Sequence, residues 1–131
     1  MSKDFENIMI VDLDVDMTRH SNKASGLRHM FLRLSSRPPT DWVRIFDNER
    51  GFPRHTMWRK AWVEGQHIVV DCVPEEIERY HLRDLKEDVA NANRKYREYI
   101  VQVQAEKERD RSAEAAEKER LRNLKGNLKF D

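Results

Sequence analysis

Three aspartates in alternate positions, Asp12, Asp14 and Asp16, have the composition of a metal-binding motif. A calcium loop places such carboxylates on a turning backbone that also contains a glycine and a later glutamate. Here they alternate with apolar residues, which is typical of a strand, and successive side chains on one strand face stand about 6.5–7 Å apart. That spacing is too wide for one ion without further ligands. We therefore expect a solvated strand face and no metal site.

Catalytic or cofactor chemistry has no supporting pattern of residues. The histidines, which show no ligand spacing, are His20, His29, His55, His67 and His81. Cys72 is the only cysteine, which excludes an internal disulfide and a cysteine-based zinc site, and its core-facing position in a predicted strand favours inert packing. Four scattered glycines form no phosphate-binding loop. We expect a protein that is not an enzyme and uses no cofactor.

The stretch around Trp58 and Trp62 is the candidate for binding nucleic acid. Both tryptophans fall on one face of a predicted strand, with Lys60 between them and Arg54 nearby, as in a base-stacking platform with phosphate contacts. Residues 17–62 carry ten basic and three acidic side chains, a net charge of +7 that suits an anion. Other interpretations stay open: core packing beneath the helices, a protein interface, or one tryptophan under the long helix and one at an edge.

A second candidate surface, for a protein partner, consists of Tyr96, Tyr99, Ile100 and Val103. It ends an apolar stripe with alternate spacings of three and four, whose members are Leu82, Leu85, Val89, Ala92, Tyr96, Tyr99 and Val103. At a rise of about 1.5 Å per residue, a helix from Pro74 to Val103 is longer than the short strands of the predicted sheet, so its far end extends past the sheet. Exposed aromatic residues at its far end would suit a partner helix or a second copy of the chain.

The elements that position these residues begin with a hairpin. Strict alternation predicts a strand over residues 8–17 whose buried face holds Met9, Val11, Leu13, Val15 and Met17, and a second strand around Met30, Leu32 and Leu34. The predicted register places Val15 by Met30, Leu13 by Leu32 and Val11 by Leu34, with Asp16 opposite His29 and Asp12 opposite Arg33 on the wet face.

A helix follows at Pro39, with Trp42, Val43, Ile45 and Phe46 on its apolar face and Gly51 as a left-handed stop. A second hairpin joins residues 57–63 and 66–73 through a Glu64-Gly65 turn. Its predicted pairs are Ala61 with Ile68, Arg59 with Val70 and Met57 with Cys72. One face of this hairpin is mostly aliphatic, and the other carries Trp58, Lys60 and Trp62.

The order β-β-α-β-β-α predicts an α+β fold, a two-layer sandwich with a four-stranded, mainly antiparallel sheet and two helices, the second long and extended. Residues 1–104 form the sandwich domain. Residues 105–131 form a charged helical arm, or a partly disordered tail, without an apolar stripe.

The expected function is a small non-enzymatic interaction module that self-associates through its long helix. The alternative is a nucleic-acid-binding domain that uses the 17–62 segment and the Trp58/Trp62 face. The longest apolar run is short and the N-terminus is polar, so we expect a cytoplasmic protein with no membrane contact.

Overall fold

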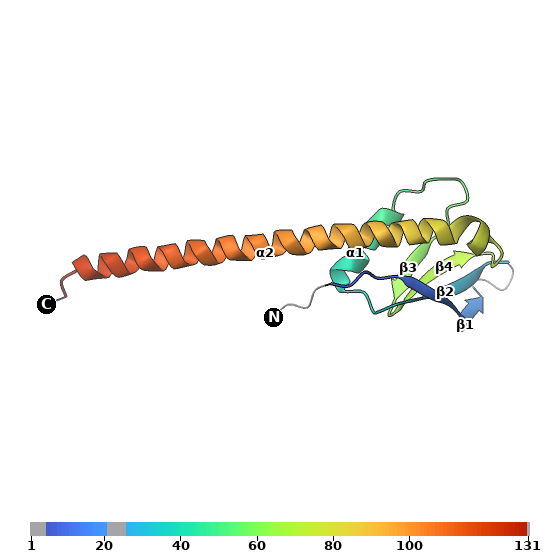
Figure 1. The fold of residues 1–131 in the computed structure, drawn as a ribbon, viewed down its shortest axis with the longest axis horizontal. Helices are drawn as coiled ribbons and strands as arrows, with labels where there is room; N and C mark the ends of the chain where they lie inside the picture. Colours follow the sequence, from blue (N-terminus) through green and yellow to red (C-terminus); the bar gives the residue numbers. More distant parts are fainter. Residues whose placement is uncertain (1–4, 21–25, 131) are drawn as a thin grey trace. The chain divides into compact units, whose positions relative to one another are not determined.

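The elements follow the predicted order, an α+β arrangement of two hairpins that are each followed by a helix. A computed structural model describes residues 5–20 and 26–130, His20 by its backbone alone. The strands are β1 (Ile10–His20), β2 (Arg28–Leu34), β3 (Ala61–Glu64) and β4 (His67–Cys72). The helices are α1 (Thr40–Arg50), a π-helical turn (Ile77–His81) and α2 (Leu82–Asn127) (Figure 1). The chain divides into two compact units, Met1–Arg97 and Glu98–Asp131.

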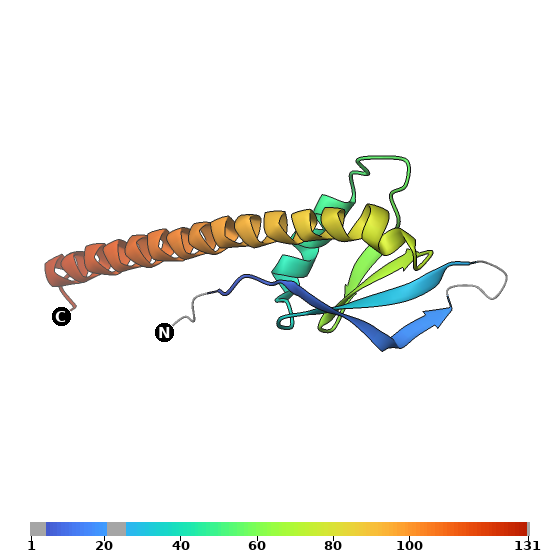
Figure 2. The same cartoon turned by 45° about the vertical axis from the view of Figure 1, so that its right-hand side comes forward.

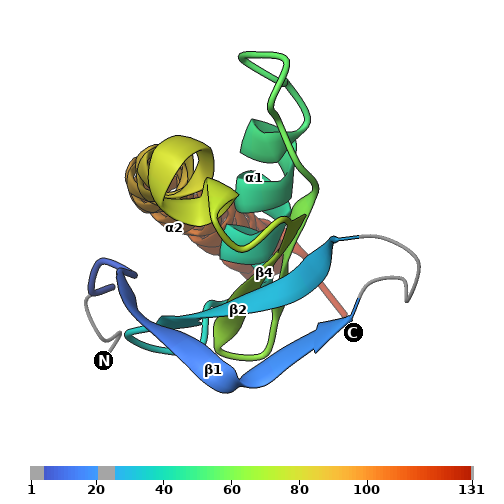
Figure 3. The same cartoon turned by 90° about the vertical axis from the view of Figure 1, so that its right-hand side faces the viewer.

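The first unit is a four-stranded antiparallel sheet in the order β1-β2-β4-β3, covered on one face by helices. Figures 2 and 3 show α1 and the first turns of α2 on the same side of the sheet. The buried cluster between the layers consists of Ile8, Met30, Leu32, Leu34, Trp42, Phe46, Ile68, Val70, Cys72, Leu85, Val89 and Ala92. The helices therefore cover the aliphatic face of the second hairpin, and Trp62 lies on the opposite face.

The predicted register of the first hairpin is confirmed only in the middle of β1. The confirmed pairs are Leu13 with Leu32 and Asp12 with Arg33. The expected pairing of Val11 with Leu34 is wrong, because the register shifts between Ile10 and Asp12 and places Ile10 opposite Leu34. A bulge of this kind adds one residue to one strand and reverses the alternation beyond it.

The second half of β1 departs further from the predicted pairs. Between Asp14↔Phe31 and Arg19↔His29 the register shifts again, so four residues of β1 stand against Met30 alone. The expected pairs of Val15 with Met30 and Asp16 with His29 are therefore wrong.

The predicted buried face of β1 is also wrong. Its five apolar side chains are exposed: Met9 by 60%, Val11 by 51%, Leu13 by 37%, Val15 by 72% and Met17 by 43%. The strand lies at the edge of the sheet, where the helices provide little cover.

The turn of the second hairpin lies one residue later than predicted, which shifts every strand pair by two residues. Its register is Ala61↔Val70, Trp62↔Val69, Val63↔Ile68 and Glu64↔His67, so the expected Ala61–Ile68, Arg59–Val70 and Met57–Cys72 pairs are wrong. Gly65 has φ +57° and opens a Gly65–Gln66 turn, where positive φ favours glycine. A register error of two residues leaves the side chains of β3 and β4 on their predicted faces, because the side-chain period of a strand is two, but residues 57–60 of the predicted strand lie outside β3.

The helix ends differ from the sequence expectation at Gly51. Pro39 precedes α1 with extended backbone, and Asp41 lies in the first turn, as helix starts favour. Gly51 has φ −68°, an ordinary right-handed conformation, so the expected left-handed stop is wrong.

Asn93 ties the N-terminal segment to α1 and α2. Its Oδ1 accepts hydrogen bonds from the backbone N–H of Ile8 (3.1 Å) and from Nε1 of Trp42 (2.9 Å). Its Nδ2 donates to the carbonyl of Ile8 (2.9 Å). The carboxamide thus pairs with Ile8 as a neighbouring strand would, and Asn93 is buried although it is polar.

The second unit is helical to Asn127, where α2 ends. Nearly all its side chains are exposed, and ion pairs within the helix join Glu108 with Arg111, Glu114 with Lys118, Glu117 with Arg120 and Glu119 with Arg122. Within the described ranges, every helix is too short or too polar to traverse a lipid bilayer.

Candidate functional site

The four residues of the predicted protein interface belong to two different environments. Tyr96 is in the first unit, where it packs against the core cluster with its ring 4.7 Å from that of Phe5. Arg97 donates to the carbonyl of Phe5 (3.0 Å) and lies over its ring. Tyr96 therefore helps to hold the N-terminal segment. Tyr99, Ile100 and Val103 lie in the second unit and are half-buried.

Three leucines in the second unit were missed by the sequence reasoning. Leu121 and Leu124 are each 48% exposed, and Leu128 is 50% exposed. Residue 121 follows Val103 by 18 positions, which is five turns of about 3.6 residues, so the two side chains leave the helix in the same direction. The signal was a stripe with spacings of three and four that starts at Ile100, becomes polar in its middle and turns apolar again at Leu121.

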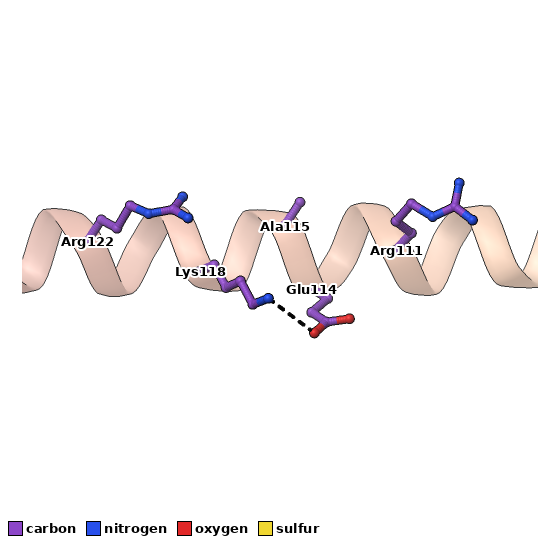
Figure 4. Close-up of a pocket in the computed structure, with 5 residues that line it drawn as sticks. All are labelled: Arg111, Glu114, Ala115, Lys118 and Arg122. Atoms are coloured by element: carbon purple, nitrogen blue, oxygen red, sulfur yellow. Dashed lines mark ion pairs between the residues drawn. The ribbon is translucent and has the colours of Figure 1, made fainter.

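A shallow depression on the second unit has no features of a binding site. Its lining residues are Arg111, Glu114, Ala115, Lys118 and Arg122. Figure 4 shows that all five project from one helix, with Glu114 and Lys118 joined by an ion pair of 3.6 Å. A depression with walls from a single exposed helix does not enclose a ligand.

The predicted nucleic-acid face is divided by the structure. Trp58, Lys60 and Trp62 line a hollow of about 520 Å³ beside β3, although only Trp62 is in the strand. The Nε1 of Trp62 donates to Glu64 (3.0 Å), and that of Trp58 donates to the carbonyl of Arg50 (3.2 Å). Trp58 and Trp62 are both half-buried, and Lys60 is exposed.

Arg54 points away from this hollow and towards a buried carboxylate. Asp88 is fully buried, and its two carboxylate oxygens lie 2.9 Å from Nη1 of Arg50 and 2.9 Å from Nη1 of Arg54. Burial lowers the pKa of Arg50, and the hydrogen bond and charge of Asp88 oppose that shift. Trp58 stacks under both guanidinium groups, at 3.7 Å from Arg50 and 4.8 Å from Arg54. Removal of one partner from a buried pair is costly, so we expect this cluster to hold α1, the following loop and α2 together.

The same cluster fixes the loop that follows α1. The Nε2 of His55 contacts the carboxylate of Asp84, and Arg54 donates to the backbone carbonyl of Asp84 (3.4 Å). Arg50 donates through Nη2 to the carbonyl of Arg59 (2.6 Å). The loop is thus attached to α2 by charged groups. The spacing of four between Asp84 and Asp88, which places both on one side of α2, was a partial sequence signal for it.

A second polar cluster surrounds the cysteine. Burial and the charge of Glu76 raise the pKa of Cys72 to about 12, which keeps its thiol protonated and removes its nucleophilic form. Burial raises the pKa of Glu76, but the Val73 N–H and the Arg59 guanidinium outweigh it and hold that pKa below its ordinary value. His81 is 2% exposed, and burial lowers its pKa, so its neutral form is favoured.

The residues that the structure describes form no candidate metal site. No group of three or more His, Cys, Asp or Glu side chains in that part of the chain could hold an ion. Asp12 pairs with Arg33 (3.3 Å) and Asp14 with His67 (3.0 Å).

Comparison with models of protein families, with curated proteins and with solved structures finds no match to the chain.

Proposed function

We propose that the chain is a small non-enzymatic interaction module that self-associates through its second unit. The supporting observation is the distribution of apolar side chains on that helix. Ile100 and Val103 lie near its start, and Leu121 and Leu124, each 48% exposed, lie near its end on the same stripe. Large apolar side chains in such a row favour a partner helix, because burial removes them from water.

An antiparallel pairing of two copies matches this distribution. The stripe has heptad spacing, with Ile100, Lys107 and Leu121 at a positions and Val103, Glu117 and Leu124 at d positions. When a positions of one helix face d positions of an antiparallel copy, Ile100 meets Leu124 and Val103 meets Leu121 of the second copy. Each end of the paired helices then holds an apolar contact.

The charges between the apolar ends favour the same arrangement in part. Lys107 faces Glu117 of the second copy, and beside the stripe Glu106 approaches Arg120 of the second copy. Asp110 faces Glu114, which repels, and Arg111 of both copies lies near these acids. Opposite charges at such positions favour one orientation over another more than they add stability.

The expected affinity is modest. Eight apolar side chains from two copies contribute at most about 1.5–3 kcal/mol each, and association costs roughly 4–15 kcal/mol. We therefore expect a dimer that dissociates on dilution below micromolar concentrations.

Sedimentation velocity of the full chain tests the proposal. Leu121→Glu/Leu124→Glu should abolish concentration-dependent association, because it places charges in the apolar contacts. Ala105→Glu/Ser112→Glu adds the same two charges on the opposite face of the helix and should leave association unchanged. Equal behaviour of the two variants would contradict the proposal.

The orientation is tested by reversing one charge pair. In the antiparallel arrangement, Lys107→Glu alone and Glu117→Lys alone each create a repulsion and should weaken the dimer. The double variant restores the pair and should recover association. In a parallel arrangement residue 107 of one copy faces residue 107 of the other, and the same holds for residue 117. Like charges then face each other in the parent and in every variant, so none of these changes would alter association.

Nucleic-acid binding is the second candidate, and the hollow that Trp58, Lys60 and Trp62 line is the observation in its favour. Against it, the charge of Arg54 is already compensated by Asp88, and that of Arg59 by Glu76 (3.4 Å). Its required signature is oligonucleotide affinity that falls steeply with salt and is lost in Lys60→Ala/Trp62→Ala. Absence of binding to single- and double-stranded oligonucleotides at low salt eliminates it.

A further inference from the structure

β1 is an edge strand with one free side. Among the strands that the structure describes, in the order β1-β2-β4-β3, it is hydrogen-bonded to β2 alone, and Figure 3 shows it as the outermost strand. Only alternate residues of an antiparallel edge strand direct their N–H and C=O groups at the neighbouring strand, and the others direct theirs outward. Such an edge can accept another extended chain through main-chain hydrogen bonds.

The same strand exposes a row of large apolar side chains. Its members are Met9, directly before β1, and Val11, Leu13, Val15 and Met17 within it, with Val15 at 72% the most exposed. Single exposed apolar residues are common on folded proteins, but five of them within nine residues of an edge strand are typical of a binding surface, although the register shifts of β1 interrupt their alternation. We call these five residues the β1 strip.

Within the β1 strip, three acidic residues alternate with the apolar ones, and no basic residue is present. Asp12 and Asp14 are partnered by Arg33 and His67, and Asp16 is exposed. Residues 9–17 carry a formal charge of −3, of which Arg33 offsets the part at Asp12.

A second copy of β1 fits this edge poorly. In an antiparallel pair centred on Leu13, apolar residues face one another, but Asp12 lies opposite Asp14 of the second copy. Centring on Asp14 places aspartate opposite aspartate again, and a shift of one residue sets aspartates against apolar side chains. Like charges in directly opposite positions are destabilising, so each register carries a penalty.

We propose that the β1 edge binds an extended segment of a partner protein in which Lys or Arg residues alternate with apolar residues. Main-chain hydrogen bonds to the edge would hold the segment. Its apolar side chains would cover the β1 strip, and its basic side chains would face the aspartates. The inference goes beyond the proposed self-association, because it uses a different surface of the chain.

The test uses peptides of about nine residues, the length of the β1 strip. A fluorescently labelled peptide of alternating Val and Lys should bind the full chain, as measured by anisotropy, with a Kd that rises with salt. A peptide of alternating Val and Glu should bind at least about tenfold more weakly. The Val-Lys peptide with alternate N-methylated amides, which removes the hydrogen bonds of one edge, should also lose about tenfold or more.

Matched variants locate the site on the protein. Val15→Lys should weaken binding of the Val-Lys peptide about tenfold or more, whereas Val101→Lys, at a residue that is 66% exposed on the second unit, should not change it. Asp16→Lys should weaken binding, and Glu78→Lys, which makes the same change in net charge at another exposed position, should have little effect.

Several outcomes would overturn the inference. Equal affinity for the Val-Lys and Val-Glu peptides would show that the aspartates do not contribute to binding. Equal affinity for the Val-Lys peptide with and without N-methylation would show that it does not bind by strand addition. Unchanged binding in Val15→Lys would place the site elsewhere. A fall in the mass of the free protein on Val15→Lys, with none on Leu121→Glu/Leu124→Glu, would show that a second copy occupies the edge. An unmodified chain that stays monomeric but still binds the Val-Lys peptide would contradict the proposed self-association and leave this inference intact.

Discussion

Asn93 is the residue whose removal should reveal most about how the first unit is held together. Asn93→Ala deletes the acceptor of Ile8 N–H and Trp42 Nε1–H and the donor to the Ile8 carbonyl. Ile8 is 2% exposed and Trp42 is fully buried. Each buried group left without a partner costs about 1–3 kcal/mol. A hollow lined in part by Ile8 and Asn93 gives water a route to the Ile8 groups, so we expect a loss of about 2–4 kcal/mol in the free energy of unfolding.

Chemical unfolding followed by tryptophan fluorescence measures this loss, because Trp42 lies at the hydrogen-bonded site. Asn91→Ala is the matched control. Asn91 lies two positions away on α2, accepts one exposed hydrogen bond from Arg94 (3.3 Å) and undergoes the same change in side chain and helix propensity. We expect the control to change stability by less than about 0.5 kcal/mol.

Equal stabilities of the two variants would refute the reasoning, because the three buried bonds would then contribute nothing beyond a solvent-exposed one. Asn93→Asp adds a second check. It keeps the acceptor but places a carboxylate oxygen against the Ile8 carbonyl, so the variant should be less stable than the parent at neutral pH and should recover part of the loss in acid.

Three further predictions concern the buried polar groups. Asp88→Ala leaves two arginines buried or half-buried without their partner and should cost about 3–5 kcal/mol of unfolding free energy, whereas Glu87→Ala, at the exposed neighbouring position, should cost little in the same titration. Burial holds the pKa of His81 below its ordinary 6.5, so stability is complete above that pH and falls as the pH drops through 6.5 towards the folded value; a His81→Gln variant with an unchanged acid slope would contradict this. Cys72, with a pKa raised to about 12, should not react with a thiol reagent at pH 8 until the protein unfolds, and prompt reaction of the native protein would refute its burial.

The layer structure could be predicted from the sequence because alternation and helical periodicity report which side chains are buried. Ile68 and Val70 alternate with the mixed positions, so the sequence placed them together on one face even though the turn was wrong by one residue, but it left open whether the helices cover that face or the tryptophan face. Face is set by the period of the strand, whereas register depends on turn geometry.

β1 shows where that reasoning fails. Alternation of apolar residues assigned Val11 and Val15 to a buried face, but the two register shifts fall next to them and both side chains are exposed. A bulge has no signature in an alternating pattern. The same pattern also does not distinguish an edge strand from a central one, and an edge strand has less cover.

The polar core residues were missed for a different reason. Asp84, Asp88 and Asn93 lie beside the apolar stripe of α2 and are buried because partners from distant segments reach them. Arg50 is 38 residues from Asp88, and Ile8 is 85 residues from Asn93. Periodicity within one helix cannot reveal such pairs, although the spacing of four between Asp84 and Asp88 offered a partial signal.

The measurement that tests the central claim most directly is the mass of a mixture of two charge variants, Lys107→Glu and Glu117→Lys. Each variant alone places like charges in the paired helices and should sediment as a 15.7 kDa monomer. Mixed in equal amounts, the variants restore opposite charges at both positions, so the mass should rise towards twice that value. A mixture that stays at 15.7 kDa at concentrations where the unmodified chain associates would contradict self-association through the second unit.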